Sequence, residues 1–321
     1  LLETLLLSIY NYDCAVASAA SRMTIAAHGR PCLDMGARRG HERAAVSAAR
    51  ASVIGGFAGT SDLEAGKRYG IPVIGTAAHA FTLLHDSERQ AFDAQIASLG
   101  PNTTLLVDTY NVTEGVKTAV EAARAAGGEL GAVRLDSGDL VAQAFTVRGQ
   151  LDALGATSTK ITVTSDLDEY AIAALGAAPV DSYGVGTRLI TGSGVPTAAL
   201  VYKLVSREDS DGNMVGVAKK SASKNTVAGK KYAGRLYDED GYASEEILFT
   251  GSAEEAAAFF EENGARPLQV PLIVDGEIQS EAWSSQALSE AQAHHLRSRN
   301  ELPYQAWRLS EGEPAIPTRY I

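Results

Sequence analysis

The sequence predicts an α/β protein with a parallel sheet and a smaller second domain. From residue 30 to about residue 200, short apolar or β-branched runs alternate with alanine-rich helical stretches. Strands that alternate with helices of ten or more residues are typical of βαβ units and a parallel sheet. The last four candidate strands begin about 20 to 30 residues apart, which suits a βα barrel or a doubly wound sheet.

The chain opens with an apolar run from Leu5 to Ile9. This run is too short to span a bilayer and lacks the basic flank of a signal peptide. Because polar residues interrupt the apolar pattern, we expect an amphipathic, buried helix. The chain reads as if it begins inside a domain, so we expect residues 1–20 to link to a missing N-terminal part.

Strand and helix patterns follow in regular order over residues 21–205, which we interpret as the α/β domain. Glycine or polar residues separate each strand from the helix after it, as short βα loops require. The strands are expected at 70–74, 104–107, 132–135, 160–164 and 180–185, and the helices from about 77, then at 114–126, 140–154 and 169–175.

The character of the chain changes after residue 205, and residues 206–321 are expected to form the second domain and a C-terminal appendage. Charged, turn-rich segments predict β-hairpins with turns at Asp211-Gly212 and Asp240-Gly241. The basic stretch Lys219–Lys231 is interpreted as a solvated hairpin, with contact to a partner's phosphate as the alternative. Further elements are expected at 253–263 (helix), 268–274 (strand) and 284–299 (helix).

Composition excludes several classes of function. The 321 residues include 39 acidic and 28 basic side chains, for a formal net charge of −11. Such a chain is a poor candidate for a general nucleic-acid or membrane-surface binder. Its two cysteines indicate no disulfide framework, so we expect reduced thiols and a cytoplasmic location.

Carboxylates, arginines, hydroxyls and glycines gather where the expected strands end. Ligands of parallel α/β folds bind beyond the carboxyl ends of the strands. Glycine backbone and arginines suit a phosphate, and carboxylates suit ribose hydroxyls or Mg²⁺. Helix capping is the alternative for any single aspartate. The residues are Asp34 with Arg38 and Arg39, Gly75-Thr76, Asp108, Asp136 and Asp139, Ser165-Asp166, and Gly186-Thr187-Arg188.

Arg134 and His79 are the two most informative single residues. Arg134 shares a strand face with Asp136, because side chains alternate along a strand. A buried arginine needs either an internal carboxylate or an anionic ligand. His79 lies in the first turn of a helix that follows a strand, where an imidazole can act as an acid, a base, a phosphate ligand or a phosphoryl acceptor.

Four motifs, taken in order, closely resemble the nicotinate phosphoribosyltransferase family. They are Gly59-Thr60-Ser61-Asp62, Gly75-Thr76-Ala77-Ala78-His79, Arg134-Leu135-Asp136-Ser137-Gly138-Asp139 and Gly184-Val185-Gly186-Thr187. The resemblance is strong over residues 1–205 and implies a type II phosphoribosyltransferase: an irregular parallel βα barrel, usually dimeric, with a smaller second domain. The implied reaction is ATP-dependent. It joins nicotinate to 5-phosphoribosyl-1-pyrophosphate (PRPP) and gives nicotinate mononucleotide, ADP, phosphate and pyrophosphate for NAD salvage.

The resemblance also implies roles for individual residues. His79 corresponds to the histidine that ATP phosphorylates, and Arg134 and Asp136 complete the implied catalytic set. A serine at Ser61, where the related nicotinamide enzyme has an aspartate, favours the acid as substrate. The implied substrate-binding residues are Arg38, Ser61, Thr76, Asp139, Asp166, Gly186 and Thr187.

Three alternatives stay open at this point. The chain could be a sister enzyme acting on nicotinamide or quinolinate. It could be a sugar-phosphate aldolase or isomerase, although Lys160 begins its strand rather than ending it. It could also be an inactive fragment, because the family's N-terminal segment carries an aromatic residue that stacks on the pyridine ring across the dimer. Mg²⁺ is the expected cofactor and ATP the co-substrate, and the residues do not identify metal ligands.

Overall fold

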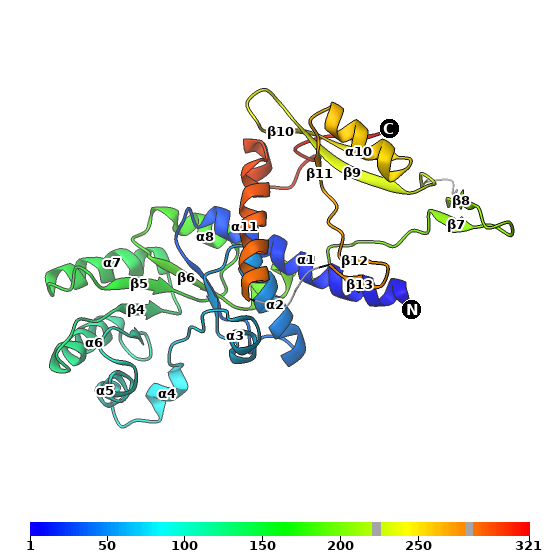
Figure 1. Cartoon of the computed structure of the whole chain (residues 1–321). Helices are drawn as coiled ribbons and strands as arrows, with labels where there is room; N and C mark the ends of the chain where they lie inside the picture. The colour runs from blue at the N-terminus through cyan, green and yellow to red at the C-terminus, as the bar shows by residue number, and fades with distance from the viewer. Residues whose placement is uncertain (220–225, 280–284) are drawn as a thin grey trace. The chain divides into compact units, whose positions relative to one another are not determined.

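The computed structural model describes residues 1–219, 226–279 and 285–321 (Figure 1). The chain divides into two compact units. The larger unit comprises residues 9–198 and 283–292, and the smaller unit comprises residues 1–8, 199–282 and 293–321. The domain boundary expected from the sequence is residue 205.

The larger unit is built on a six-stranded, entirely parallel sheet in the order β2-β1-β6-β5-β4-β3, curled into a half barrel. The predicted α/β class with a parallel, irregular barrel sheet is therefore confirmed. Figure 1 shows β4, β5 and β6 lying side by side. The strands are β1 (Cys32–Asp34), β2 (Gly59–Thr60), β3 (Thr104–Leu106), β4 (Ala132–Leu135), β5 (Lys160–Val163) and β6 (Ser182–Val185).

The central strands are buried on both of their faces. All four residues of β4 are buried, and so are the last three residues of β5 and of β6. Continuous burial of this kind is typical of parallel sheets with helices packed on them. Register pairs Leu135 of β4 with Val163 of β5, so these strands end at the same level.

The helices of the larger unit begin at side-chain caps. Asn111, Asp139 and Asp168 each accept a hydrogen bond from a backbone N–H in the first turn of α6, α7 and α8. The cap of α6 is Asn111, whose side-chain oxygen accepts from the Glu114 N–H. The helices are α1 (Leu2–Ala26), α2 (Glu42–Ile54), α3 (Leu63–Tyr69), α4 (His79–Leu83), α5 (Glu88–Leu99), α6 (Val112–Ala125), α7 (Leu140–Ala153), α8 (Glu169–Ala174) and α9 (Thr187–Ile190).

The strand expected at 70–74 is wrong in extent. Only Val73 bridges to Thr60 of β2, and Pro72 accepts a hydrogen bond there through its carbonyl oxygen. Proline has no N–H to donate, so the segment cannot continue as a regular ladder. The actual strand is the two-residue β2, which precedes α3.

The expected burial of the opening apolar run is also wrong. Leu5 and Ile9 are exposed, and the buried face of α1 lies further along the helix. Its buried residues recur three or four positions apart, as one face of a helix requires. They are Ala15, Val16, Ala19, Ala20, Met23 and Ala26. No helix in the described ranges is long and apolar enough to cross a bilayer.

The smaller unit contains the two expected hairpins. One pairs β7 (Ser206–Glu208) with β8 (Met214–Gly216), and the other pairs β9 (Lys231–Tyr237) with β10 (Ala243–Thr250). The second hairpin joins a four-stranded sheet with β11 (Arg266–Pro267) and β14 (Thr318–Tyr320). Much of the predicted Lys219–Lys231 hairpin stretch, residues 220–225, lies outside the described residues.

Helix α10 (Ala253–Glu262) packs Phe260 against Ile247 of this sheet in a small core. The strand predicted at 268–274 is not continuous, because the chain forms β11 and then a separate short hairpin. That hairpin pairs β12 (Ile273–Val274) with β13 (Glu277–Ile278). The last long helix is α11 (Ser285–Asn300); residue 284, where it was predicted to begin, lies outside the described residues.

Candidate functional site

Two cavities lie at the carboxyl ends of the strands, where the sequence predicted a ligand site. They share Met35, Arg38 and Arg134 as lining residues. The larger cavity has a volume of about 460 Å³ and is also lined by Arg39, Asp136, Thr164, Ser165, Asp166, Gly184, Gly186 and Thr187. The smaller has a volume of about 230 Å³ and is also lined by Ala37, Ser61, Gly75, Thr76 and Ala78.

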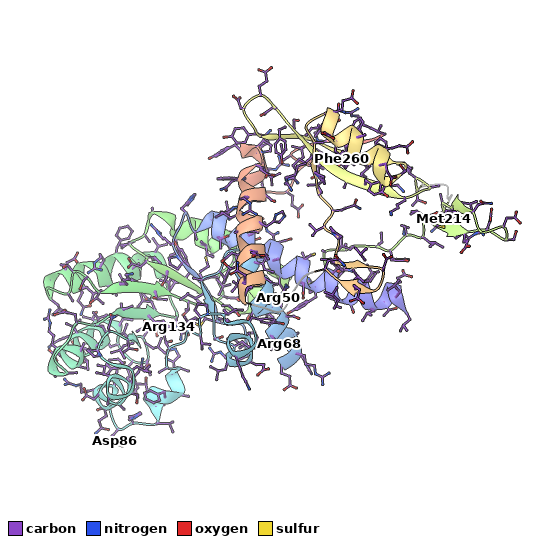
Figure 2. All side chains as sticks on the ribbon, in the orientation of Figure 1. Arg50, Arg68, Asp86, Arg134, Met214 and Phe260 are labelled. Carbon is purple, nitrogen blue, oxygen red and sulfur yellow. The ribbon has the colours of Figure 1, made fainter. Side chains whose placement is uncertain are left out.

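Arg134 is the third residue of β4 and is labelled in Figure 2. Its side chain bonds residues of three segments around the cavities. Its guanidinium group donates hydrogen bonds to the Thr164 hydroxyl at 2.8 Å, the Thr76 hydroxyl at 2.7 Å and the Asp136 carboxylate at 2.9 Å. The residue is 6% exposed, so these bonds replace the solvation that a buried cation loses. Of the two partners expected for a buried arginine, Arg134 therefore has the internal carboxylate, that of Asp136.

Asp136 receives donors from several directions. The Thr164 hydroxyl and Arg134 both donate to its Oδ1 atom. Burial alone raises the pKa of this carboxyl, but the Thr164 hydrogen bond, Arg134 and His79 together lower it below the ordinary value of 3.8. Asp136 is therefore an anion at neutral pH beside the larger cavity.

His79 is the first residue of α4, and both of its ring nitrogens face polar side chains. Its Nδ1 atom lies 3.1 Å from the Thr109 hydroxyl. Its Nε2 atom lies 3.6 Å from Asp136 Oδ2 and 3.8 Å from Asp108 Oδ1. Asp108 and Thr109 follow β3, so two consecutive residues at one strand end face the two sides of one imidazole.

A second polar network fixes the loop after β1. The buried Asp34 accepts hydrogen bonds from the Thr60 hydroxyl at 2.6 Å and from the Gly36 backbone at 2.7 Å. Burial raises the pKa of Asp34 in spite of these bonds. The Ser61 N–H donates to the Asp34 carbonyl. These contacts place Ser61 beside the loop that carries Arg38, and both residues line the smaller cavity.

The end of β6 and the turn after it line the larger cavity. A Cβ atom at Gly184 would lie 2.5 Å from the Thr164 side chain, so the close approach of β6 to β5 requires glycine there. Ser165, which follows β5, has a φ of 117°. Non-glycine residues rarely adopt this conformation, and such strain is concentrated at functional sites.

The structure brings most of the predicted residues together. Arg38, Ser61, Thr76 and Arg134 line the smaller cavity, and Arg38, Arg134, Asp136, Asp166, Gly186 and Thr187 line the larger one. His79 lines neither cavity, but it contacts Asp136, which does. Asp139 caps α7 by accepting from the Ala142 N–H and lines neither cavity.

Three residues contribute to this geometry without a clear signal in the sequence. Thr164 was read only as the end of a strand, yet it joins Arg134 to Asp136. Thr109 carried no signal beyond its position after Asp108. Met35 lines both cavities, and an isolated methionine after a strand looks like ordinary core.

Known proteins resemble both this sequence and this fold. The pattern of the nicotinate phosphoribosyltransferase (NAPRTase) family matches residues 31–241. A nicotinate phosphoribosyltransferase of Mycobacterium tuberculosis is 53% identical over 329 aligned positions, which cover all of this chain and 70% of the relative. The chain belongs to the nicotinate phosphoribosyltransferase family.

Two solved structures share this fold. A nicotinate-nucleotide pyrophosphorylase from Pyrococcus furiosus is 26% identical, with a TM-score of 0.75 over 93% of this chain and 73% of that one. The human nicotinic acid phosphoribosyltransferase shares the fold, with a TM-score of 0.74, 24% identity and coverage of 96% and 72%. The segment matched by the nicotinate phosphoribosyltransferase pattern contains every residue that lines the two cavities.

Proposed function

We propose that this chain transfers the phosphoribosyl group of PRPP to nicotinate and releases pyrophosphate. The observation that carries the proposal is the pair of adjoining cavities that share Arg38 and Arg134. A two-substrate transfer needs two compartments that meet at the reacting atoms, because orientation of the reactants supplies much of the rate. Membership of the nicotinate phosphoribosyltransferase family supports this assignment.

The smaller cavity suits a ring that carries a carboxylate. Arg38 and Arg134 line it together with the hydroxyl-bearing Ser61 and Thr76. Guanidinium groups and hydroxyls hydrogen-bond a carboxylate. Its described lining residues include no acidic side chain, which favours the acid over the amide, because a carboxylate would accept from an amide NH₂ and repel nicotinate.

The larger cavity suits PRPP. The Gly186-Thr187 turn offers backbone and hydroxyl donors for a phosphate, Arg39 supplies a positive charge, and Asp166 can accept from ribose hydroxyls. Asp136 is anionic and lies where the two cavities meet through Arg134. It would stabilise positive charge that develops on the ribose ring.

The proposed reaction needs no general base. The lone pair of the pyridine nitrogen attacks C1 of the ribose, the bond from C1 to the pyrophosphate oxygen breaks, and pyrophosphate leaves with that electron pair. Arg134 would orient the nicotinate carboxylate while Asp136 faces the ribose. Closely held reactants in this geometry lower the entropic part of the barrier.

Mg²⁺ is proposed as the cofactor, carried by the substrate. Within the described residues there is no group of three or more His, Cys, Asp or Glu side chains arranged to hold a metal. Mg²⁺ commonly binds through phosphates and water with few protein ligands. It would neutralise charge on the departing pyrophosphate, and no residue of this chain is assigned as its ligand.

His79 is proposed as the residue that ATP phosphorylates. Its exposure, its two facing carboxylates and its contact with Asp136 support a role through charge and local ordering rather than in bond formation. The homodimer and the place of the product in NAD salvage stay predictions from the resemblance, and the cytoplasmic location stays a prediction from the cysteine content.

Turnover of three pyridines tests the proposal. Pyrophosphate release would be measured with PRPP and nicotinate, nicotinamide or quinolinate, each with and without ATP. Nicotinate should give the highest kcat/KM, and ATP should stimulate it. Preference for either other pyridine would overturn the substrate assignment. Calorimetric binding of PRPP and nicotinate without any turnover would show a binding protein instead of an enzyme.

A further inference from the structure

Ser165 has a backbone conformation unlike that of the other non-glycine residues in the described ranges. Four of those residues have a φ between 48° and 58°, in the small left-handed helical region that L residues can occupy. They are His28, Ser193, Ala199 and Asp275. Ser165 has a φ of 117°, well outside that region, where glycine is the residue that avoids steric conflict.

A glycine would suit this position better if only the backbone mattered. Gly56, with a φ of 105°, shows that the chain uses glycine for a similar conformation elsewhere. A serine is less stable at such a φ, because its Cβ atom meets the neighbouring backbone. Its side chain is what distinguishes Ser165 from a glycine, so the reason for a serine lies in that side chain.

The residues on either side hold Ser165 in this conformation. The Thr164 N–H donates to the Leu135 carbonyl at 2.8 Å, and the Thr164 hydroxyl donates to the Asp136 carboxylate. Two residues after Ser165, the Leu167 N–H donates to the Ser165 carbonyl at 2.7 Å, and Leu167 is buried. The chain is thus fixed to the sheet before Ser165 and to the core after it, which is how a strained residue persists.

The side chain held in this way is open to a ligand. Ser165 is exposed and lines the larger cavity, as Thr164 and Asp166 also do. Successive side chains of a regular strand point to opposite faces, so the turn at Ser165 allows three consecutive residues to line one cavity. Among the residues that the structure describes, the Ser165 hydroxyl has no hydrogen-bond partner, whereas the Thr164 hydroxyl is already bonded to Arg134 and Asp136.

We propose that Ser165 is a substrate-binding residue whose hydroxyl donates a hydrogen bond to a ribose hydroxyl in the larger cavity. A sugar hydroxyl both donates and accepts hydrogen bonds. The Ser165 hydroxyl can donate to it, and a carboxylate such as that of Asp166 can accept from it. The two adjacent side chains are therefore complementary to one ribose. The inference rests on the proposed function, in which PRPP occupies this cavity.

Charge favours a ribose hydroxyl over a phosphate as the partner of Ser165. The carboxylates of Asp136 and Asp166 line the same cavity and repel a phosphate. A phosphate has better partners elsewhere in the cavity, at the Arg39 guanidinium group and the Gly186-Thr187 turn. The neutral ribose is thus the part of PRPP that suits the end of β5.

Calorimetric binding of ribose 5-phosphate and of pyrophosphate tests this assignment in wild type, Ser165→Ala and Ser165→Gly. Both variants lack the hydroxyl, so their Kd for ribose 5-phosphate should rise roughly three- to tenfold, as expected for one lost hydrogen bond. Their Kd for pyrophosphate, which has no ribose, should stay as in wild type. Ser98→Ala, at an exposed serine of α5, is the matched control and should bind both ligands as wild type does.

Urea unfolding of the same variants tests the strain separately from the hydroxyl. Ser165→Gly should unfold at a higher urea concentration than Ser165→Ala, because glycine adopts a φ near that of Ser165 without conflict. A glycine variant no more stable than the alanine variant would show that the serine backbone is unstrained, and the reason given for a serine at this position would fail.

Equal affinity of wild type and Ser165→Ala for ribose 5-phosphate would overturn the inference, as would an absence of ribose 5-phosphate binding by wild type. Weakened binding in Ser165→Gly alone would assign the effect to the backbone, and an equal loss for pyrophosphate would assign the hydroxyl to a phosphate; either result overturns it. Weaker binding of ribose 5-phosphate alone in both variants supports it, even if nicotinate is not converted and the proposed function fails.

Discussion

Arg134 uses three of its N–H groups on the chain itself, on Thr76, Asp136 and Thr164. A guanidinium group has five N–H donors, so two remain for a ligand. Because the side chain is already fixed, a bound carboxylate would not have to order it. An arginine held in this way has a lower entropic cost of binding than a mobile surface arginine.

Ser61 is the residue at which the choice between acid and amide can be tested. Ser61→Asp would place a carboxylate in the smaller cavity, where Ser61 is a lining residue. We expect kcat/KM for nicotinate to fall by roughly 10²-fold or more, because a like charge near the substrate carboxylate costs several kcal/mol. The ratio of nicotinate to nicotinamide turnover measures the effect. Ser61→Ala is the control, and an unchanged ratio in Ser61→Asp would contradict the assignment.

Asp136 should contribute to stability in a pH-dependent way. Its pKa is lower in the folded protein than the ordinary 3.8, because the Thr164 hydrogen bond and Arg134 outweigh burial. A lowered acid pKa stabilises the fold above the unfolded value, and the effect is lost as the pH falls through the folded value. The free energy of unfolding, measured in urea, should therefore fall less for Asp136→Asn than for wild type as the pH drops from about 5 toward 3.

The control for this measurement is Asp93→Asn, which removes an exposed i,i+4 partner of Arg89. Exposed pairs contribute little to stability, so its pH dependence should match wild type. At neutral pH, Asp136→Asn should be less stable than wild type because Arg134 loses its carboxylate. Equal pH dependence in the wild-type and Asp136→Asn proteins would show that the carboxyl is not stabilised by its neighbours.

At the scale of elements, sequence patterns succeeded where a strand or helix had its own apolar run. The segments 132–135, 160–164 and 180–185 were predicted within two residues of β4, β5 and β6. The two-residue β2 was missed, because so short a strand has no periodicity and is defined only by pairing with β1. Pro72 looked like part of a strand because its neighbours are β-branched.

Gly184 determines how closely β6 can approach β5. Gly184→Ala would bring a Cβ atom to 2.5 Å from Thr164 Cγ2 and 3.2 Å from Met35 Cγ. Thr164 cannot rotate away without breaking its bonds to Arg134 and Asp136. We expect a loss of about 1–3 kcal/mol in the free energy of unfolding and a raised KM for PRPP. Gly149→Ala, in α7 with open space around its Cβ position, should not destabilise the fold.

At the scale of the whole molecule, the net charge is −11, although arginines gather at the larger cavity. Arg38 and Arg39 are exposed and line the larger cavity. Increasing salt from about 0.1 M to about 1 M shortens the screening length from about 10 Å to about 3 Å. The KM for PRPP should therefore rise several-fold with salt, and less steeply in Arg39→Gln.

Arg124→Gln is the matched control for the salt measurement. Arg124 lies in the last turn of α6, whereas the cavities lie at the carboxyl ends of the strands. Its removal should leave the salt dependence of KM unchanged. A salt-independent KM in wild type would show that the arginines of the cavity do not attract PRPP through their charge.

The candidate site was predictable to the extent that its residues follow strands in the sequence. Asp136, Asp166 and Thr187 were placed by that rule, and each lines the larger cavity. Thr109 could not be found in this way, because a threonine shortly after a strand is ordinary. Its contact with the His79 ring depends on how α4 packs, and no local pattern encodes that.

The hydrogen bonds of Thr164 form only when β4 and β5 pair in their native register. Thr164 follows β5, whereas Arg134 belongs to β4 and Asp136 follows it. A slip of one residue between the two strands would turn the threonine to the opposite face of the sheet. Arg134 would then be buried without that partner, so misregistered chains lose stability and binding together. During refolding, ligand binding should consequently appear only once β4 and β5 have paired in their native register.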